Sequence, residues 1–580
     1  MLELQGYRMG VRRLAITDPL ADQPILHGAP GRGLSLVFNG SLAYPDRLRQ
    51  GLAEQGLQPV TGNDAELVLL AYRAQGIAGL RLLEGPFAFA IADESRGELI
   101  LGRDAFGEKP LFYSRGSDGS WPGFASTVLA MRILHAESGS RPSPEAVRSV
   151  ASQGWTEWDG PELGLDLVEF PRGTIAVFAR DRQPVFHELL AGPARRDAQT
   201  LSLETLIRRS VQGRVHGDRP LGLLLSGGLD SACLAMALRD LEHPALCLSL
   251  DLEGMVPESE RAREVASHLG LAHRAFVAGP EILDDLEGLI QGLGVPLADS
   301  SLLATHRICR EARKEGLGIL LSGEGGDELF LGYRRQRAGP WLGLAQDLLP
   351  GPPRMILSRL AHGMSRRSWG AGLRLVHALG RQEASYSALW SLASPVDLEA
   401  LFGTGGYEAG VATPAQVVAA FDGGREDVGD AAAETLVRQE LDGYLAYDLC
   451  PKLDCASLAA GVEARAPLLD SRLLLRRRRQ ALGHFESQGK GEIRDILAQA
   501  LPARLRGGPK RGFGIPLGPW LAAWPRARTI LGETPGLPWS RAVALTMLED
   551  LVHGRGLHRA PLLYHLLVLA IHIQARRQPA

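Results

Sequence analysis

The segment Leu221–Ser231, LGLLLSGGLDS, constrains the fold of this chain more than any other stretch. Its apolar first half predicts a buried strand, and leucines at helical spacing follow its second half. A strand, a glycine-rich turn and a helix N-terminus form an anion site, because free backbone N–H groups point outward where the helix dipole is positive. The carboxylate of Asp230 would repel a phosphate there unless a cation lay between them. The segment therefore predicts a site for a magnesium-bound nucleotide.

The same residues also suit an ordinary tight turn, in which Gly and Ser are common. The full string SGGLDS, however, resembles the pyrophosphate loop of the ATP pyrophosphatases, which cleave ATP between its α and β phosphates. It lacks the lysine of the GxxxxGK[ST] loop, which argues against a kinase or a γ-phosphate NTPase. The resemblance implies that the ATP phosphates are held by Leu224, Ser226, Gly227, Gly228, Asp230 and Ser231.

Strands and helices alternate in the part of the chain that follows residue 200. Repeated strand–helix units indicate a doubly wound parallel sheet, whose ligands bind at the carboxyl ends of the strands. The apolar patterns predict helices at 203–211, 258–269, 281–293 and 301–315, and strands at 221–225, 245–250, 273–277 and 318–321.

A second glycine-rich loop, Ser322–Tyr333 (SGEGGDELFLGY), follows the last of these strands. Three carboxylates, Glu324, Asp327 and Glu328, lie close together in it and would repel one another without a nearby cation. A solvated acidic loop is the ordinary interpretation of such a run. The position at a strand end favours a different one, in which Asp230 and Asp327 share a Mg²⁺ on the pyrophosphate and Glu324 lies nearer the substrate.

SGEGGDELFLGY resembles the signature of the glutamine-dependent asparagine synthetases. The resemblance implies that Glu324 helps to deliver ammonia, as a base or proton relay, and that Ser322 and Gly323 belong to the nucleotide site. Cys455 stands where the family has an arginine, which weakens the implication that aspartate is the substrate. Further segments similar to the family are PLADSS at 296–301, KLDCAS at 452–457 and GVEARAPLLD at 461–470.

Two lysines lie in later segments that also resemble the family. Lys490 stands in GKG at 489–491, and Lys510 stands in GPKRGFGIPL at 508–517. A lysine on a glycine-proline loop can act as a point charge on phosphates as they separate, although a solvated lysine is the ordinary alternative. The resemblance implies that Lys510 is the catalytic lysine and that Lys490 is a secondary contact in the pyrophosphate site.

Residues 1 to about 180 combine short strands with few helices. A helix is predicted at 64–75, capped by Asp64 and ended by Gly76. The pattern indicates a sheet sandwich flanked by helices, and no chemistry follows from it alone. The predicted strands are 34–39, 87–92, 98–101, 111–114 and 174–178.

Several motifs in this region resemble the glutaminase domain of asparagine synthetase: RLAI at 13–16, FNG at 38–40, TGNDAE at 61–66, GPFAFA at 85–90 and GRDAFGEKPL at 102–111. The resemblance implies that Arg13, Asn39 and Asp64 are glutamine-binding positions. The family's nucleophile is a cysteine directly after the initiating Met, whose own α-amine acts as the base.

That nucleophile is missing from the sequence as written, because no cysteine precedes Cys233. Ser41 also replaces a family glutamate that resembles a partner of the substrate ammonium. Two explanations stay open: the domain is a relic whose glutamine positions are vestigial, or the true translation start lies upstream.

Composition limits the remaining possibilities. A chain of 580 residues exceeds one hydrophobic core, so we expect domains at 1–180 and 201–580, joined by a linker at 181–200 that is rich in Pro, Gly and Arg. With 63 Lys and Arg against 66 Asp and Glu, nothing favours a nucleic acid or an anionic membrane as a partner. Five cysteines without metal-ligand spacing suit reduced thiols of a cytoplasmic protein. No apolar run has the length of a membrane helix.

The patterns predict an α/β chain, and the resemblance implies an incomplete αββα sandwich of the Ntn-hydrolase type followed by a doubly wound ATP pyrophosphatase domain with a helical C-terminal extension. The resemblance implies a ligase that uses ATP and Mg²⁺ to form an aspartyl-adenylate, which ammonia or glutamine nitrogen converts to asparagine. We expect small-molecule substrates, and a homodimer is compatible with the sequence. Two alternatives are an amide or lactam synthetase acting on a peptide or amino-acid derivative, and a nucleotide-binding protein without catalysis.

Overall fold

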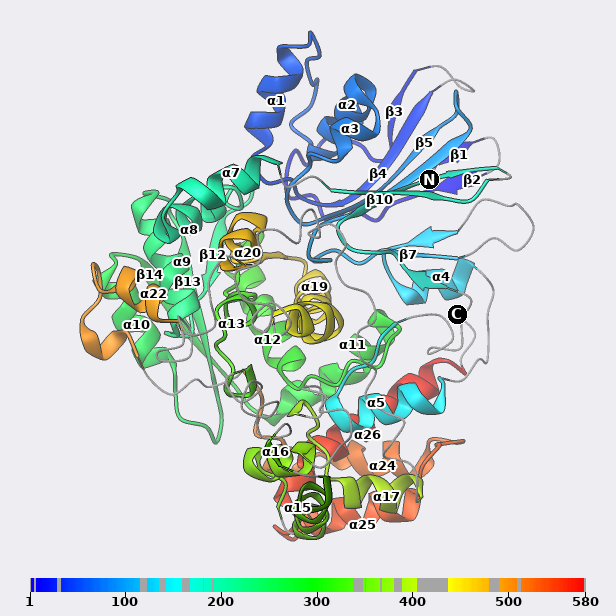
Figure 1. Cartoon of the computed structure of the whole chain (residues 1–580), viewed down its shortest axis with the longest axis vertical. Coiled ribbons are helices and arrows are strands. Elements are labelled where there is room, and N and C mark those ends of the chain that lie inside the picture. Colours follow the sequence, from blue (N-terminus) through cyan, green and yellow to red (C-terminus); the bar gives the residue numbers. More distant parts are fainter. Residues whose placement is uncertain are drawn as a thin grey trace.

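The computed structural model shows two sheet regions and a layer of helices beside them (Figure 1). The N-terminal third forms antiparallel sheets, and a parallel sheet follows in the middle of the chain. The α/β class predicted from the sequence is confirmed. The structure describes residues 2–4, 7–28, 33–114, 123–134, 142–158, 167–180, 182–189, 192–336, 348–349, 351–365, 368–379, 389–403, 437–478, 490–507 and 513–577.

The larger N-terminal sheet has six strands, and each neighbouring pair is antiparallel. Its strand β5 (Phe87–Asp93) is buried along its whole length, so both faces of the sheet are covered. Phe87 and Phe89 lie in the core cluster on one face, and Ala88 and Ala90 lie in the cluster on the other. The strand order is β11 (Val185–Glu188), β10 (Thr174–Ala179), β6 (Glu98–Arg103), β5, β4 (Leu34–Gly40) and β3 (Ile25–His27).

Helix α2 (Asp64–Gln75) covers one face of this sheet, and a small sheet covers the other. Leu67 and Val68 of α2 belong to the first core cluster, whereas Tyr113 of the small sheet belongs to the second. The predicted sandwich is thereby confirmed. The small sheet has the order β8 (Phe124–Ala125), β7 (Phe112–Tyr113) and β9 (Val168–Glu169), and the other elements here are β1 (Leu2–Leu4), β2 (Tyr7–Met9), α1 (Pro45–Ala53), α3 (Ile77–Leu80), α4 (Val128–Leu134) and α5 (Pro144–Gln153).

Helix α2 has the predicted limits, but the expectation that Asp64 caps it was wrong. Asn63 is the N-cap, and its side chain accepts a hydrogen bond from the backbone N–H of Ala65 at 3.0 Å. Asp64 is already helical, and its carboxylate accepts a hydrogen bond from the backbone N–H of Leu42 at 2.9 Å. Two adjacent residues could each cap this helix, and the sequence pattern did not distinguish them.

Five parallel strands form the second sheet. The chain adds strands outward on one side of the first strand, β12, and then returns to add the others on its opposite side. This reversal is the topological switch point at which doubly wound sheets bind ligands. The two glycine-rich loops follow β12 and β15, which are neighbours at this point. The order is β14 (Ala272–Ala278), β13 (Leu246–Leu252), β12 (Leu221–Leu224), β15 (Ile319–Leu321) and β16 (Glu463–Arg465).

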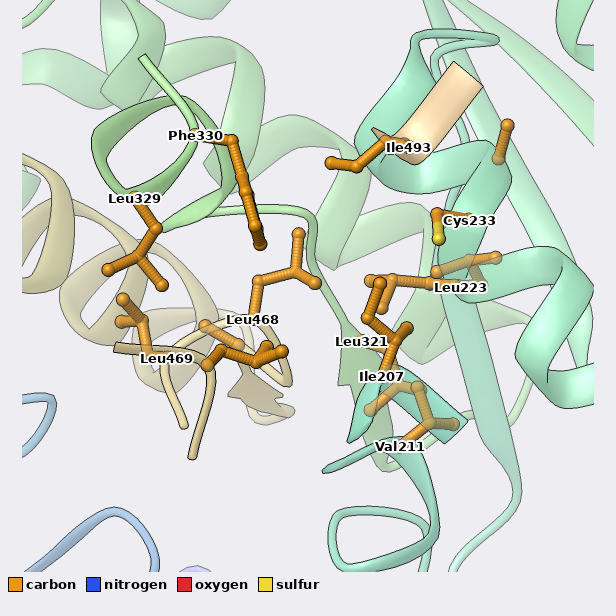
Figure 2. Close-up of a cluster of buried hydrophobic side chains, with 14 of the residues drawn as sticks. Ile207, Val211, Leu223, Cys233, Leu321, Leu329, Phe330, Leu468, Leu469 and Ile493 are labelled. Atoms are coloured by element: carbon orange, nitrogen blue, oxygen red, sulfur yellow. The ribbon is translucent and has the colours of Figure 1, made fainter. Parts of the chain in front are cut away.

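Helices pack on both faces of the parallel sheet, which confirms the doubly wound arrangement. Leu223 and Leu321 lie in one core cluster, shown in Figure 2, and Leu248 and Leu320 lie in the cluster on the other face. Helices α8 (Leu203–Gln212), α9 (Leu229–Asp240) and α10 (Ser259–His268) contribute to the first cluster, and α11 (Leu286–Leu293) and α12 (Ser301–Lys314) to the second.

The helix predicted at 281–293 is divided in the structure. A 3₁₀ segment, η1 (Pro280–Asp285), precedes α11 and changes the helical period before the apolar face of α11 begins. The prediction of one continuous α-helix was therefore wrong at its N-terminal half.

The C-terminal part of the chain is mainly helical. Helix α26 (Ala560–Ala575) is apolar nearly all round and buried, as expected for a core helix. A π-helix, η5 (Glu440–Leu449), continues directly into α19 (Cys450–Ala459). Within the described residues, no helix combines the length and the apolar composition needed to cross a membrane. The others are α13 (Gly326–Leu329), α15 (Gly351–Met364), α16 (Ala371–Leu379), α17 (Pro395–Phe402), α20 (Ser471–Arg478), α22 (Gly491–Leu497), η6 (Ala503–Leu505), α23 (Leu517–Ala523), α24 (Pro525–Glu533), α25 (Arg541–Val552) and η7 (Leu557–Arg559).

The segment predicted as a linker carries regular structure. Strand β11 pairs with β10, and helix α7 (Gly192–Thr200) packs against α20. Arg472 of α20 lies 3.0 Å from Asp197 of α7, and it also donates to Glu84 Oε1 of the N-terminal region at 3.1 Å. One guanidinium thus joins three parts of the chain.

A buried ion pair also links the N-terminal region to α19. Lys109 Nζ donates to Asp454 Oδ1 at 2.7 Å, and the two side chains are only 3% and 9% exposed. Removing one partner of such a pair leaves a buried, uncompensated charge, which costs roughly 3–5 kcal/mol.

We therefore expect Lys109→Met to lower the free energy of unfolding by roughly 3–5 kcal/mol. The double variant Lys109→Met/Asp454→Leu should recover most of this loss, because neither charge remains. Urea denaturation of the three proteins measures both values, and an unchanged midpoint for Lys109→Met would contradict the expectation.

Candidate active site

The two glycine-rich loops bring their carboxylates to one positive charge. Asp230 lies in the first turn of α9, and Asp327 lies in the short helix α13. Both carboxylates form ion pairs with Nζ of Lys490, and the distance from Asp327 Oδ1 is 2.6 Å. Residues from three distant parts of the sequence therefore meet at the switch point of the parallel sheet.

Glycines allow the two loops to approach so closely. A Cβ on Gly326 would lie 2.5 Å from Asp230 Oδ1, and a Cβ on Gly332 would lie 1.7 Å from Asp327 Oδ1. A side chain at either position would displace one of the carboxylates. Steric clashes therefore explain why glycine occupies these two positions of SGEGGDELFLGY.

Lys490 reaches the site from the C-terminal part of the chain. It is the N-cap residue of α22 and adopts a left-handed backbone conformation, with φ at 39°. Ile493 anchors α22 in the core cluster that also contains Cys233 of α9 (Figure 2). Burial alone would lower the pKa of Lys490, but Asp230 and Asp327 outweigh it and raise the pKa, so the side chain is an ammonium.

The same carboxylates fit a magnesium ion. Asp230 and Asp327 already point their oxygens at a single cation, and carboxylate oxygens are ligands that Mg²⁺ prefers. Among the described residues, no three His, Cys, Asp or Glu side chains gather as a complete metal site. Mg²⁺ on a nucleotide is usually held by one or two carboxylates together with substrate phosphates and water.

The loop after β12 has the features of an anion site. Leu224 ends the strand, and Gly227 has a φ of 73°, which a residue with a side chain rarely adopts. The hydroxyls of Ser226 and Ser231 lie 3.3 Å apart, and Ser226 Oγ also accepts a hydrogen bond from the Gly228 N–H at 3.3 Å. The predicted phosphate-binding residues therefore surround the N-terminus of α9.

The start of the second loop lies against this same helix end. The Ser322 N–H donates to the carbonyl of Arg465 at 2.9 Å, which ties the loop to β16. A Cβ on Gly323 would lie 3.1 Å from Asp230 Cβ. Ser322 and Gly323 are thus placed beside the carboxylate that the first loop contributes.

Glu324 pairs with a different lysine. Its Oε1 lies 3.1 Å from Nζ of Lys452 in α19, and Asp299 Oδ2 lies 3.4 Å from the same nitrogen. The loop after β15 therefore contributes to two clusters, one on Lys490 and one on Lys452. This second pairing was not predicted from the sequence, although both residues lie in segments that resemble the family. A lysine within the otherwise apolar run around Cys450–Leu453 was the available signal.

The three predicted glutamine positions line one cavity. Arg13, Asn39 and Asp64 border a space of ≈ 1160 Å³ between the six-stranded sheet and the end of α19. The Arg13 guanidinium donates to backbone carbonyls of its own loop, including that of Asp18 at 2.9 Å. Asp64 Oδ2 lies 3.4 Å from Nε2 of His216. The structure thus brings these residues to one cavity, with Arg13 engaged by its own loop.

Comparison with known proteins identifies the family. Residues 202–571 match the family model described as asparagine synthase, and residues 2–185 match the model of a glutamine amidotransferase domain. The chain belongs to the asparagine synthase family. The resemblance drawn from the motifs is confirmed, and members of this family are carbon–nitrogen ligases.

The relatives differ in how much of the chain they share. A Mycobacterium tuberculosis protein, whose name gives asparagine synthetase (glutamine-hydrolyzing) as a provisional assignment, is 29% identical over 89% of this chain and 81% of its own length. Asparagine synthetase (glutamine-hydrolyzing) 1 of Bacillus subtilis is 28% identical over 60% of this chain and 55% of its own. Asparagine synthetase (glutamine-hydrolyzing) 3 of Arabidopsis thaliana is 30% identical over 55% and 52%. The chain thus spans about half the length of the last two.

Two further positions of the family pattern are Lys510 and Cys455. Lys510, which the family pattern implies as the catalytic lysine, lies outside the described residues. Cys455, in place of the family arginine, packs against the core cluster beneath the sheet, and burial raises the pKa of its thiol to about 12. The thiol is therefore uncharged and cannot replace the positive charge of an arginine.

Lys490 supplies the cation of the site in the absence of substrate, which gives a testable expectation. Lys490→Met should leave Asp230 and Asp327 facing each other and destabilise the protein by about 2 kcal/mol, less than for a fully buried pair because both carboxylates are partly exposed. Millimolar Mg²⁺ without nucleotide should raise the melting temperature of this variant more than that of the unsubstituted protein. Lys490→Arg is the control, and equal Mg²⁺ responses in a thermal melt would contradict the expectation.

Proposed function

We propose that this chain is an ATP-dependent amide ligase that activates the side-chain carboxylate of aspartate as an acyl-adenylate and amidates it to give asparagine. The observation that carries the proposal is the meeting of Asp230 and Asp327 on one cation at the N-terminus of α9. An anion site beside paired carboxylates suits a magnesium-bound pyrophosphate better than it suits any uncharged ligand. Membership of the asparagine synthase family supports the same reaction.

In the first step, the substrate carboxylate attacks the α-phosphorus of ATP, and pyrophosphate leaves with the electron pair of the broken P–O bond. The backbone N–H groups of the loop at 226–231, with the Ser226 and Ser231 hydroxyls, bind the phosphates. Asp230 and Asp327 would hold Mg²⁺, which when bound stabilises negative charge on the departing pyrophosphate. Lys490 and Lys510 add positive charge to the phosphates.

In the second step, ammonia attacks the acyl carbon, the bond between that carbon and the AMP oxygen breaks, and AMP departs. The nitrogen must lose a proton as the amide forms. Glu324 takes this proton, because its carboxylate stands on the same loop as Asp327 and remains partly open to solvent, at 27% exposure.

The N-terminal region would take part in providing the nitrogen that attacks the acyl-adenylate. We propose domains at 1–180 and 201–580 joined through 181–200, with Arg13, Asn39 and Asp64 as an amino-acid site in the cavity of the first domain. Free ammonium is the nitrogen donor that we propose, because its attack on the acyl-adenylate requires no nucleophilic residue of the N-terminal region.

A second acyl substrate is favoured by one observation. Cys455 offers an uncharged thiol where the family pattern has a cation, so this position supplies no positive charge for a substrate carboxylate. A peptide or amino-acid derivative that lacks this carboxylate would fit the altered position, and its own amine could then replace ammonia as the nucleophile.

Product analysis tests the proposal. The purified chain is incubated with Mg²⁺, ATP, ammonium and aspartate, and the products are identified by mass spectrometry. Formation of asparagine, AMP and pyrophosphate in equal amounts is expected. AMP and pyrophosphate formed only with another acid would favour the second substrate class, and ADP with phosphate would contradict both.

A further inference from the structure

A row of buried ionisable groups lies behind Glu324. Lys452 contacts Glu324 at 3.1 Å and Asp299 at 3.4 Å, and Asp448 is close enough to hydrogen-bond to Asp299. The side chains are 27% exposed at Glu324, 14% at Asp299 and 5% at Lys452, and Asp448 is a buried residue. The row therefore runs from the loop at the nucleotide site into the core of the C-terminal region.

The members of this row come from several segments of the chain. Asp299 precedes α12 and accepts hydrogen bonds from the backbone N–H and the hydroxyl of Ser301, both at 2.8 Å. Lys452 lies in α19, and Asp448 lies in the π-helix η5 that leads into it. π-helical segments are rare and frequently occur at functional sites. Lys452 and Asp448 thus stand on one continuous helical segment, whereas Asp299 and Glu324 stand on loops beside it.

The charges in this row are not balanced. Three carboxyl groups face one ammonium, so full ionisation would leave a surplus of negative charge in a buried place. Burial would raise the pKa of Asp299, but Lys452 and the hydrogen bonds from Ser301 outweigh it and lower the pKa. Burial and the neighbouring Asp299 raise the pKa of Asp448 well above its ordinary range. A raised pKa favours the protonated form of Asp448, which reduces the surplus of negative charge beside Asp299.

Two polar atoms near this row have no hydrogen-bond partner among the described residues: Asp448 Oδ1 and the hydroxyl of Tyr564, which is fully buried in α26. Burial raises the pKa of Tyr564, and the neighbouring Asp299 and Asp448 raise it further. A purely structural ion cluster is normally balanced and fully hydrogen-bonded, because unpaired buried groups are costly. Unsatisfied groups beside a surplus of charge instead indicate a functional cluster.

We propose that Lys452, held in place by Asp299 and Asp448, is a positioning residue that aims the Glu324 carboxylate at the attacking nitrogen. This inference rests on the proposed function and extends it to the amide-forming step. As the C–N bond forms and the bond from the acyl carbon to the AMP oxygen breaks, Glu324 accepts the proton released by the nitrogen, and AMP leaves with the electron pair. Lys452 itself gives up no proton and touches neither substrate.

The experiment separates the two half-reactions. Lys452→Met should slow formation of the amide from the adenylate about 10²-fold in a rapid-quench measurement, because a misplaced base loses most of its effect. Aspartate-dependent exchange of pyrophosphate into ATP should change less than about threefold, since Asp230 and Asp327 do not depend on Lys452. The loss should appear in kcat and not in the KM for ammonium. Lys452→Arg, which keeps the charge, should recover most of the rate.

A control variant and a fallback variant accompany Lys452→Met. Lys314→Met removes an exposed lysine that pairs with Glu311 at 2.9 Å, and it should leave both half-reactions unchanged. If Lys452→Met fails to fold, Asp299→Asn retains the lysine but removes its carboxylate partner, and a loss confined to amide formation is again expected.

Equal loss of both half-reactions, or no loss of either, would overturn the role of Lys452. An unsubstituted protein that performs neither half-reaction would instead overturn the proposed function itself, and the inference with it.

Discussion

Asp230→Ala is expected to lower aspartate-dependent ATP–pyrophosphate exchange about 10³-fold. The carboxylate lies in the first turn of α9, beside the phosphate loop, and shares a cation with Asp327. Without it, the bound magnesium ion would lose one of two protein ligands, and the negative charge that develops on pyrophosphate would be less well stabilised.

A control on the same helix excludes a general effect on folding. Asp240, at the C-terminal end of α9, is partly exposed and forms an ion pair with the neighbouring Arg239. Asp240→Ala should exchange pyrophosphate at the unsubstituted rate. A folded Asp230→Ala protein with normal exchange would remove Asp230 from the nucleotide site.

Glu324→Gln should spare adenylate formation and slow amide formation, whereas Asp230→Ala slows adenylate formation. The amide of glutamine keeps the size of the side chain and can still contact Lys452, but it cannot accept a proton at neutral pH. Adenylate formation should remain within about threefold of the unsubstituted rate, and amide formation should fall about 10²- to 10³-fold. Single-turnover kinetics with radiolabelled aspartate measures both steps in one experiment.

Glu315→Gln provides the matched control, because Glu315 pairs with Arg274 at the far end of α12, away from both loops. It should not alter either step. An equal loss of adenylation in Glu324→Gln would mean that Glu324 acts on the nucleotide, and an unchanged amide rate would exclude it as the base.

Much of the fold could be predicted because local patterns determine it. Phe87–Asp93 and Asp64–Gln75 are apolar runs that are buried over most of their length, so their composition, their lengths and the flanking Gly76 recovered both elements. The order of strands and helices after residue 200 also indicated the doubly wound sheet, with its ligand site at the carboxyl ends of the strands. From there, the approach of the two acidic loops followed from topology, since both end neighbouring parallel strands.

The contacts that no local pattern contains could not be predicted. Lys452 lies in α19 and Glu324 lies in the loop after β15, and tertiary packing brings their side chains within 3.1 Å. The same is true of Lys490, whose position depends on Ile493 docking in a core cluster of distant residues. Sequence motifs marked both lysines as belonging to the family pattern, but the partners of each depend on tertiary structure.

Activation of the substrate carboxylate as its AMP ester is the central claim, and an oxygen label tests it most directly. Aspartate carrying ¹⁸O at both oxygens of its side-chain carboxylate is incubated with the enzyme, Mg²⁺, ATP and ammonium. The mass of the nucleotide product is then measured by mass spectrometry. One ¹⁸O atom should appear in each AMP, because the bond to the acyl carbon breaks when the nitrogen attacks. Unlabelled AMP, or label in inorganic phosphate beside ADP, would contradict the account.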